Sequence, residues 1–146
     1  MRWWLWAGVT ALALAMRRSS ADPQQLTPHF HLREFASRGQ LPTDTQTISR
    51  LRTLAENLEV LRRELGRPIV VISGWRSQNH NEAIDGATQS QHLFGRAADI
   101  VVAGMTPAQV FAAIERLQAQ GKMEQGGLAA YDSFTHYDTR GYPVRW

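Results

Sequence analysis

The chain has 146 residues, of which 43% are hydrophobic and 20% charged, and it contains no cysteine. This length suits one domain with a modest core, and the composition is that of a folded globular protein. The lack of cysteine excludes disulfides, thiol nucleophiles and cysteine-ligated zinc, so any metal site must use histidine and carboxylate ligands. The net charge of +3 favours anionic partners. Nucleic acid is not the expected partner, because the arginines are scattered and accompany no binding motif.

The first 21 residues resemble a targeting segment rather than part of the fold. Arg2 precedes an apolar run over 3–16, and a small-residue cleavage site ends at Ala21. The run is short for a membrane span, so we expect a cleaved export signal, a periplasmic or cell-envelope location, and one domain over 22–146. Because two arginines follow the run, against the usual charge order, an uncleaved anchor that associates with the membrane is the alternative.

A short arm and a long helix are predicted next. Closely spaced apolar side chains suggest that the segment 24–39 packs on the core. Asp44 then supplies an N-cap for a helix over 45–65, in which apolar residues recur at steps of three and four. Gly66 ends this helix, and one of its faces is expected to be buried.

Two strands follow, with a long polar loop between them. The β-branched run 68–73 is typical of an interior strand, and 97–102 predicts another. The loop 74–95 carries two of the five histidines. Loops of this length without regular structure are uncommon in compact domains and are often functional.

The remaining residues predict a second helix and a hairpin. A capping box of Thr106 and Gln109, with proline at the first helical position, begins a helix that ends near Gly121. Two glycines then open a hairpin with strands near 128–131 and 134–138. These elements together predict an α+β domain with a small, mainly antiparallel sheet and packed helices.

Four side chains suggest a metal site. His92 and Asp99 lie seven residues apart, with Gly95 permitting a sharp turn between them. His136 and Asp138 are two apart on a predicted strand and therefore project from the same face. Two histidines and one carboxylate suit a catalytic zinc with a fourth position open to water. Spacing alone leaves the alternative that these are hydrogen-bonded structural residues.

Four motifs occur in order along the chain: Ser73-Gly74-Trp75-Arg76-Ser77, Ser90-x-His92-x-x-Gly95-x-Ala97-x-Asp99-Ile100, Gly126-Gly127 to Tyr131, and Phe134-x-His136-x-Asp138. Together they resemble the D-alanyl-D-alanine carboxypeptidase-like zinc peptidases, and within that family the murein endopeptidases and phage cell-wall peptidases. The likeness extends from about Phe30 to Trp146. It implies the α+β architecture shared with hedgehog and D-Ala-D-Ala peptidases.

The resemblance implies a role for each matching position. His92, Asp99 and His136 would bind Zn²⁺, and Arg76 would point its guanidinium at the substrate or the oxyanion. A surface arginine in a turn is the alternative for Arg76. Asp138 is the nearest candidate for the general base, and a carboxylate that orients His136 is the alternative.

Two further residues are candidate substrate contacts. Ser90 is expected to hydrogen-bond within the site and Tyr131 to line the cleft, with a buried core tyrosine as the alternative. The chain departs from the family pattern at Leu128-Ala129-Ala130, where members often carry valine and glycine, and at Thr139-Arg140-Gly141. Both departures adjoin the cleft and leave substrate detail open.

The expected function is hydrolysis of a peptide bond in the stem or cross-link of peptidoglycan by a monomeric zinc peptidase. A zinc-stabilised wall-binding module without catalysis is the alternative. Neither the bond cleaved nor a phage as against a housekeeping origin follows from the sequence.

Overall fold

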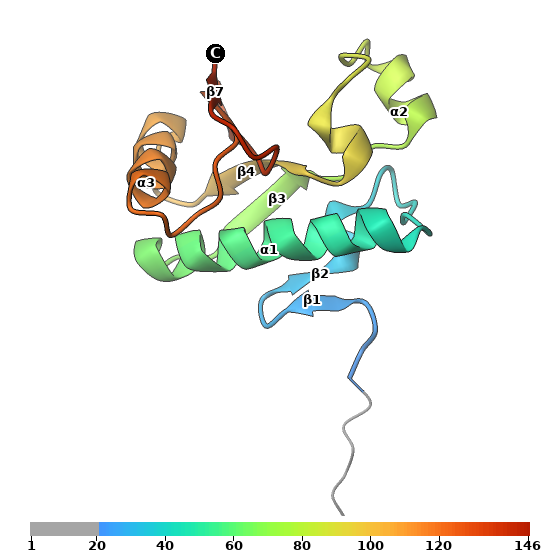
Figure 1. Ribbon diagram of the computed structural model, residues 1–146, viewed down its shortest axis with the longest axis horizontal. Helices are drawn as coiled ribbons and strands as arrows, with labels where there is room; N and C mark the ends of the chain where they lie inside the picture. Colours follow the sequence, from blue (N-terminus) through green and yellow to red (C-terminus); the bar gives the residue numbers. More distant parts are fainter. Residues whose placement is uncertain (1–20) are drawn as a thin grey trace, which may run out of the picture.

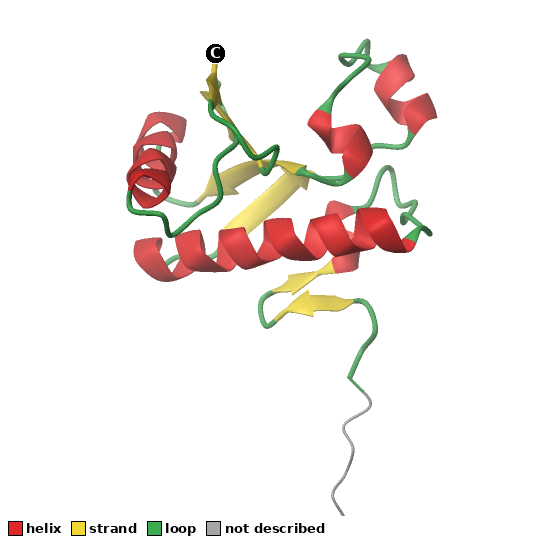
Figure 2. Ribbon diagram, in the orientation of Figure 1, coloured by secondary structure: helices red, strands yellow, loops and turns green. Residues whose placement is uncertain are grey.

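The computed structural model describes residues 21–146, so the predicted targeting segment lies outside the described residues except for Ala21. Figure 1 shows the long helix α1 crossing the front of the molecule, with a small hairpin beneath it, and Figure 2 separates the helices from the strands. The elements in chain order are β1 (Gln25–Thr27), β2 (Phe30–His31), η1 (Leu32–Phe35), α1 (Thr45–Leu65), β3 (Ile69–Ser73), α2 (Gln78–Ala83), η2 (Gln91–Phe94), β4 (Ala97–Val102), α3 (Pro107–Ala119), β5 (Gly127–Ala130), β6 (Thr135–Asp138) and β7 (Val144–Arg145).

The main sheet has five strands in the order β3-β4-β6-β5-β7. The first three pairings are antiparallel, and only β5 and β7 run parallel. Helix α3 contacts β5, β6 and α1, so helices and sheet share one core. The predicted α+β class with a mainly antiparallel sheet is confirmed.

Helix α1 has the predicted bounds. The Asp44 carboxylate accepts a hydrogen bond from the Thr47 backbone N–H at 2.7 Å, and Gly66 ends the helix in the left-handed region at φ 60°. The middle of the apolar face is fully buried, with Leu51, Leu54, Leu58 and Leu61 each 0% exposed, and Ile48 and Leu65 at its ends are partly buried.

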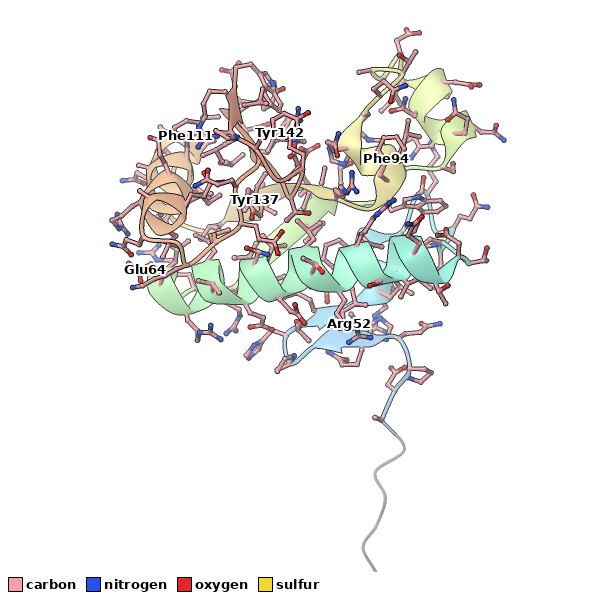
Figure 3. The ribbon with its side chains drawn as sticks, viewed as in Figure 1. Arg52, Glu64, Phe94, Phe111, Tyr137 and Tyr142 are labelled. Carbon is pink, nitrogen blue, oxygen red and sulfur yellow. The ribbon has the colours of Figure 1, made fainter. Side chains whose placement is uncertain are left out.

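The predicted arm is also confirmed, and it forms the β1–β2 hairpin and η1. Phe30 and Phe35 are buried in the core. Arg52 of α1 donates to the Leu26 carbonyl oxygen at 2.6 Å, which joins the hairpin to the helix (Figure 3). Glu59 of α1 accepts hydrogen bonds from the Thr27 hydroxyl and the His29 backbone N–H, both at 2.8 Å. The arm is therefore held by buried side chains and by polar contacts with α1.

Helix α3 and the hairpin β5–β6 agree with the prediction to within two residues. Thr106 and Gln109 make both hydrogen bonds of a capping box. Leu128 of β5 pairs with Tyr137 of β6, and both side chains are fully buried. These elements are specified by local patterns, which explains why the sequence located them.

The prediction that 68–73 forms an interior strand was wrong. Strand β3 pairs only with β4 and lies at one edge of the sheet. Val70 and Ile72 are 55% and 54% exposed, whereas Ile69 is buried. A continuous β-branched run indicates a strand but does not specify its position, because strand order depends on pairing with distant segments.

The segment 74–95 is not an irregular loop. It contains α2, which is capped by Ser77, and η2, which is capped by Ser90. His80, one of the two histidines of this segment, contacts the buried Ser37 hydroxyl through Nδ1 at 2.7 Å. Within 21–146, no helix has the length and apolar character needed to cross a bilayer.

Candidate metal centre and cleft

Three elements bring His92, Asp99 and His136 together. Asp99 of β4 and His136 of β6 are direct partners in the antiparallel register, and cross-strand partners project from the same face of a sheet. His92 lies in η2, immediately before β4. Gly95 makes the turn between them at φ 73°, and a Cβ there would meet Thr47 at 2.9 Å. The turn and the strand register therefore place the three side chains at one point.

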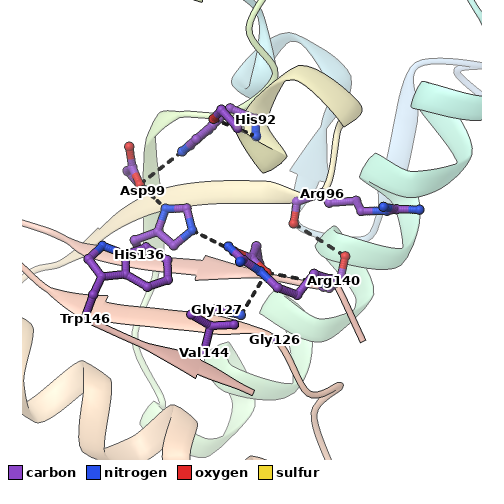
Figure 4. Close-up of polar contacts among 12 residues, drawn as sticks. His92, Arg96, Asp99, Gly126, Gly127, His136, Arg140, Val144 and Trp146 are labelled. Atoms are coloured by element: carbon purple, nitrogen blue, oxygen red, sulfur yellow. Dashed lines mark hydrogen bonds and ion pairs between the residues drawn. The ribbon is translucent and has the colours of Figure 1, made fainter. Parts of the chain in front are cut away.

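The three side chains converge in a buried cluster, drawn in Figure 4. His136 Nδ1 lies 2.9 Å from Asp99 Oδ1, and His92 Nε2 lies 3.4 Å from the same oxygen. One ligand atom from each of the three residues lies within 4.8 Å of the others. His92, Asp99 and His136 are buried. These three residues could hold a metal ion.

The outer nitrogen of each histidine is already engaged. His92 Nδ1 lies 2.6 Å from the Gly74 carbonyl oxygen, and His136 Nε2 lies 2.9 Å from Asp138 Oδ2. Both partners are acceptors, so each outer nitrogen carries the proton and donates. The inner nitrogens of both rings face Asp99, and each can either carry a proton or, once deprotonated, offer its lone pair to a metal ion. This donor set of two imidazoles and one carboxylate fits a zinc ion.

The electrostatics of the cluster suit a cation. Burial alone would raise the pKa of Asp99, but hydrogen bonds with His136 and His92 hold it well below its usual range. Burial opposes protonation of His136, yet its hydrogen bonds with Asp138 and Asp99 raise its pKa above the usual value. The centre therefore keeps a buried carboxylate ionised and attracts either a proton or a metal ion.

Asp138 lies behind His136 and is fully buried. Besides His136, it accepts hydrogen bonds from the Gly127 backbone N–H at 2.8 Å and from Arg140 Nε at 2.8 Å and Nη2 at 2.6 Å. Asp138 does not line the cleft described below. Its position fits the alternative of orienting His136 better than that of reaching a substrate, and its role as a general base stays a prediction.

The Gly126–Gly127 motif has a physical reason in this packing. A Cβ on Gly126 would collide with the Asp138 backbone carbonyl, and one on Gly127 would collide with the Asp138 carboxylate. Arg140 belongs to the same network, and the sequence did not indicate its contact with Asp138. The available signal was its position two residues after Asp138, just past the end of the strand, where an extended chain would place both side chains on one side.

An open cleft of about 540 Å³ lies over the cluster. Six of the seven predicted site residues line it, and Asp138 is the exception. The six are Arg76, Ser90, His92, Asp99, Tyr131 and His136. Arg140, which the sequence placed beside the cleft, also lines it. Phe134 and Trp146 line it as well, and nothing local in the sequence indicated that these two residues of the C-terminal segment face the site.

Arg76 sits beside the centre rather than on the outer surface. Its Nη2 lies 3.4 Å from Asp99 Oδ2, and its Nε donates to Ser73 Oγ at 3.3 Å. Burial lowers the pKa of Arg76, while the charge of Asp99 opposes that shift. These long contacts leave the guanidinium with donors available to a ligand in the cleft.

Ser90 and Tyr131 differ in how they face the cleft. Ser90 Oγ accepts from the His92 backbone N–H at 3.3 Å and so caps η2. Tyr131 is 43% exposed, which contradicts the alternative of a buried core tyrosine. Its ring stacks on Phe134 with centroids 4.6 Å apart, and its hydroxyl accepts from Trp146 Nε1 at 2.6 Å.

Comparison with known proteins identifies the family to which the chain belongs. The family model described as Peptidase M15 matches residues 28–138. Among solved structures, the chain is similar to the L-Ala D-Glu endopeptidase ChiX of Serratia marcescens, at 21% sequence identity and a TM-score of 0.43, over 70% of this chain and 93% of that one. No curated protein matches the chain. Because the family model covers most of the described residues and all three residues of the cluster, the chain belongs to the Peptidase M15 family.

Proposed function

We propose that this protein is a zinc-dependent peptidase that hydrolyses peptide bonds of bacterial peptidoglycan. The observation that carries the proposal is the buried cluster of His92, Asp99 and His136 at the base of an open cleft. These residues would hold a zinc ion, which would lower the pKa of a bound water and polarise the scissile carbonyl. The peptidoglycan substrate is supported by the resemblance of four ordered motifs to cell-wall peptidases, and the net charge of +3 suits an anionic wall.

Arg76 is the proposed electrostatic partner of the substrate. Its guanidinium lines the cleft next to Asp99 and is held only by contacts of 3.3 and 3.4 Å. A planar fork of donors in a partly buried position suits either a substrate carboxylate or the oxyanion that forms when the carbonyl is attacked. Tyr131 and Ser90, which line the same cleft, are the proposed additional substrate contacts.

We assign Asp138 to positioning His136 rather than to proton transfer. A general base must come within hydrogen-bond reach of the proton that it removes. Both Asp138 oxygens are occupied by donors, and the carboxylate is fully buried. Among the cleft-lining residues of 21–146, Asp99 is the only carboxylate. The network Arg140–Asp138–His136 is therefore proposed to fix which nitrogen His136 offers to the metal.

Digestion of purified sacculi tests the proposal. The full-length protein is incubated with sacculi, with zinc or with a zinc chelator, and the released muropeptides are identified by mass spectrometry. We expect new fragments that disappear with the chelator and with His92→Ala, whereas the matched control His29→Ala, on the arm, retains them. An unchanged profile from folded, zinc-loaded protein that still binds sacculi would instead favour a wall-binding module.

A further inference from the structure

The cleft has an exposed aromatic wall, of which the proposed function uses only Tyr131, as a substrate contact of unspecified kind. Large hydrophobic side chains exposed within 21–146 include Tyr131 at 43%, Tyr142 at 58% and Trp146 at 54%. Tyr131 and Trp146 line the cleft together with Phe134. We call Tyr131, Phe134 and Trp146 the aromatic wall. Exposed apolar surface gathered at a cleft marks a binding site more often than a structural feature.

The rings of the aromatic wall are fixed in place before any ligand arrives. Trp146 Nε1 donates to the Tyr131 hydroxyl at 2.6 Å, and Tyr131 stacks on Phe134 at an interplanar angle of 22°. The Arg140 guanidinium lies 5.5 Å from the centroid of the Trp146 ring, within cation–π range. Because the rings of the aromatic wall contact one another and Arg140, a ligand could bind to their exposed faces without first reordering these side chains.

Trp146 connects this wall to the metal centre. Its ring centroid lies 5.1 Å from that of His136, so a group resting on the indole would sit beside the bond to be cleaved. Figure 1 shows β7 at the top of the view and the segment that contains η2, in yellow, to its right. The second segment contributes Gln89, Ser90 and Gln91 to the cleft. One side of the cleft is therefore aromatic, and the other offers neutral amide and hydroxyl groups.

The chemistry of the two sides identifies the class of ligand. A pyranose ring has C–H groups that pack on the electron-rich face of an indole or phenol, while its hydroxyl and acetamido groups hydrogen-bond at the edge. A pocket for an aliphatic side chain would instead be enclosed by aliphatic residues. Among the residues of 21–146 that line this cleft, only Ala87 and Val144 are aliphatic. We propose that the aromatic wall is a subsite for a sugar ring of the glycan strand.

This proposal rests on the proposed function, because it names the part of peptidoglycan that lies next to the cleaved peptide. A sugar held at Trp146 places the reactive peptide bond close to the glycan. The protein should then prefer stem peptides that still carry their sugars over the same peptides in free form.

The first test compares two substrates of identical peptide sequence, one attached to its disaccharide and one free. The ratio of their kcat/KM values is measured for the full-length protein and for Trp146→Ala, Trp146→Phe and Tyr142→Ala, after the zinc content of each has been equalised. Stacking energies predict that Trp146→Ala lowers the ratio about tenfold. Trp146→Phe should recover much of it. Tyr142→Ala, an equally exposed aromatic outside the cleft, should match the wild type. An unchanged ratio in Trp146→Ala would overturn the subsite.

A second measurement separates this proposal from the peptidase itself. Binding of an N-acetylglucosamine tetramer to the metal-free protein is followed by calorimetry, which requires no catalysis. Binding that Trp146→Ala abolishes and Tyr142→Ala leaves intact supports the subsite even if sacculi are never cleaved. Absence of sugar binding in the wild type overturns the subsite even if chelator-sensitive cleavage establishes the peptidase.

Discussion

His136 donates a hydrogen bond through Nε2 to Asp138 Oδ2 at 2.9 Å, and this contact determines that Nδ1 faces Asp99. Arg140 and Gly127 hold Asp138 in turn. Three residues from one hairpin and the turn after it, Gly127, Asp138 and Arg140, therefore set the orientation of a single imidazole. A carboxylate in this position makes the ring a stronger metal ligand and limits its rotation.

Removing this support should weaken metal binding. Asp138→Asn and Arg140→Gln are each expected to lower zinc affinity by roughly 10- to 100-fold, the usual effect of losing a residue that orients a ligand. Competition with a chromophoric chelator measures the zinc dissociation constant. Arg116→Gln, which removes an exposed arginine paired with Glu64, serves as the control. If Asp138→Asn binds zinc like the wild type but no longer turns over substrate, Asp138 is the general base and the positioning assignment fails.

The close approach of Gly127 to Asp138 should make this glycine intolerant of a side chain. In Gly127→Ala the added Cβ would collide with the Asp138 carboxylate and lie 2.8 Å from Arg140 Nη2. We expect a loss of stability of about 2–4 kcal/mol, together with loss of zinc binding. Gly121→Ala is the comparison, because a Cβ added at Gly121 would meet no atom within 4 Å and only the backbone φ of 70° is unfavourable for alanine. That variant should lose about 1 kcal/mol. Urea unfolding of the two variants checks the difference, and equal losses would contradict the account.

Zinc should stabilise the folded protein through the three cluster residues. At a free zinc concentration of about 100 times the dissociation constant, the gain is about 2.7 kcal/mol. A thermal melt with and without zinc is expected to show a higher Tm for the wild type. His92→Ala and His136→Ala should show no such rise, while His29→Ala should show the same zinc-dependent rise as the wild type. A zinc-dependent rise that persists in both cluster variants would place the metal elsewhere.

The contact between the arm and α1 should depend on pH through Glu59. Burial favours the neutral acid, but hydrogen bonds with His29 and Thr27 outweigh it, and the pKa of Glu59 lies below its ordinary value of 4.5. A lowered pKa stabilises the fold above the unfolded-state pKa, and that contribution is lost as pH falls through the folded-state value. Glu59→Gln should therefore cost about 1–2 kcal/mol at pH 7. The gap from the wild type should narrow below about pH 4.5. Chemical unfolding at pH 7 and pH 3 checks this, and a gap that stays constant would refute it.

The sequence by itself determined the features that depend on neighbouring residues. The bounds of α1 follow from Asp44, Gly66 and the spacing of apolar residues between them, and the start of α3 follows from a capping box. The motifs around His92, Asp99 and His136 indicated the cluster because they resembled a family. The geometry of an antiparallel strand pair then explains why Asp99 and His136 meet.

Only the tertiary structure decided how these parts are arranged around the cleft. The sequence of β3 predicts an interior strand, but β3 lies at an edge of the sheet. The position of a strand in a sheet depends on pairing between distant segments, which the local sequence does not specify. Asp138 shares a strand face with His136, yet Arg140 and Gly127 surround it and the cleft does not reach it. The contact between Trp146 and Tyr131 joins residues 15 positions apart. Local patterns determine the helices and strands and the candidate metal-binding residues. Long-range packing determines which of those side chains line the cleft and which are buried behind it.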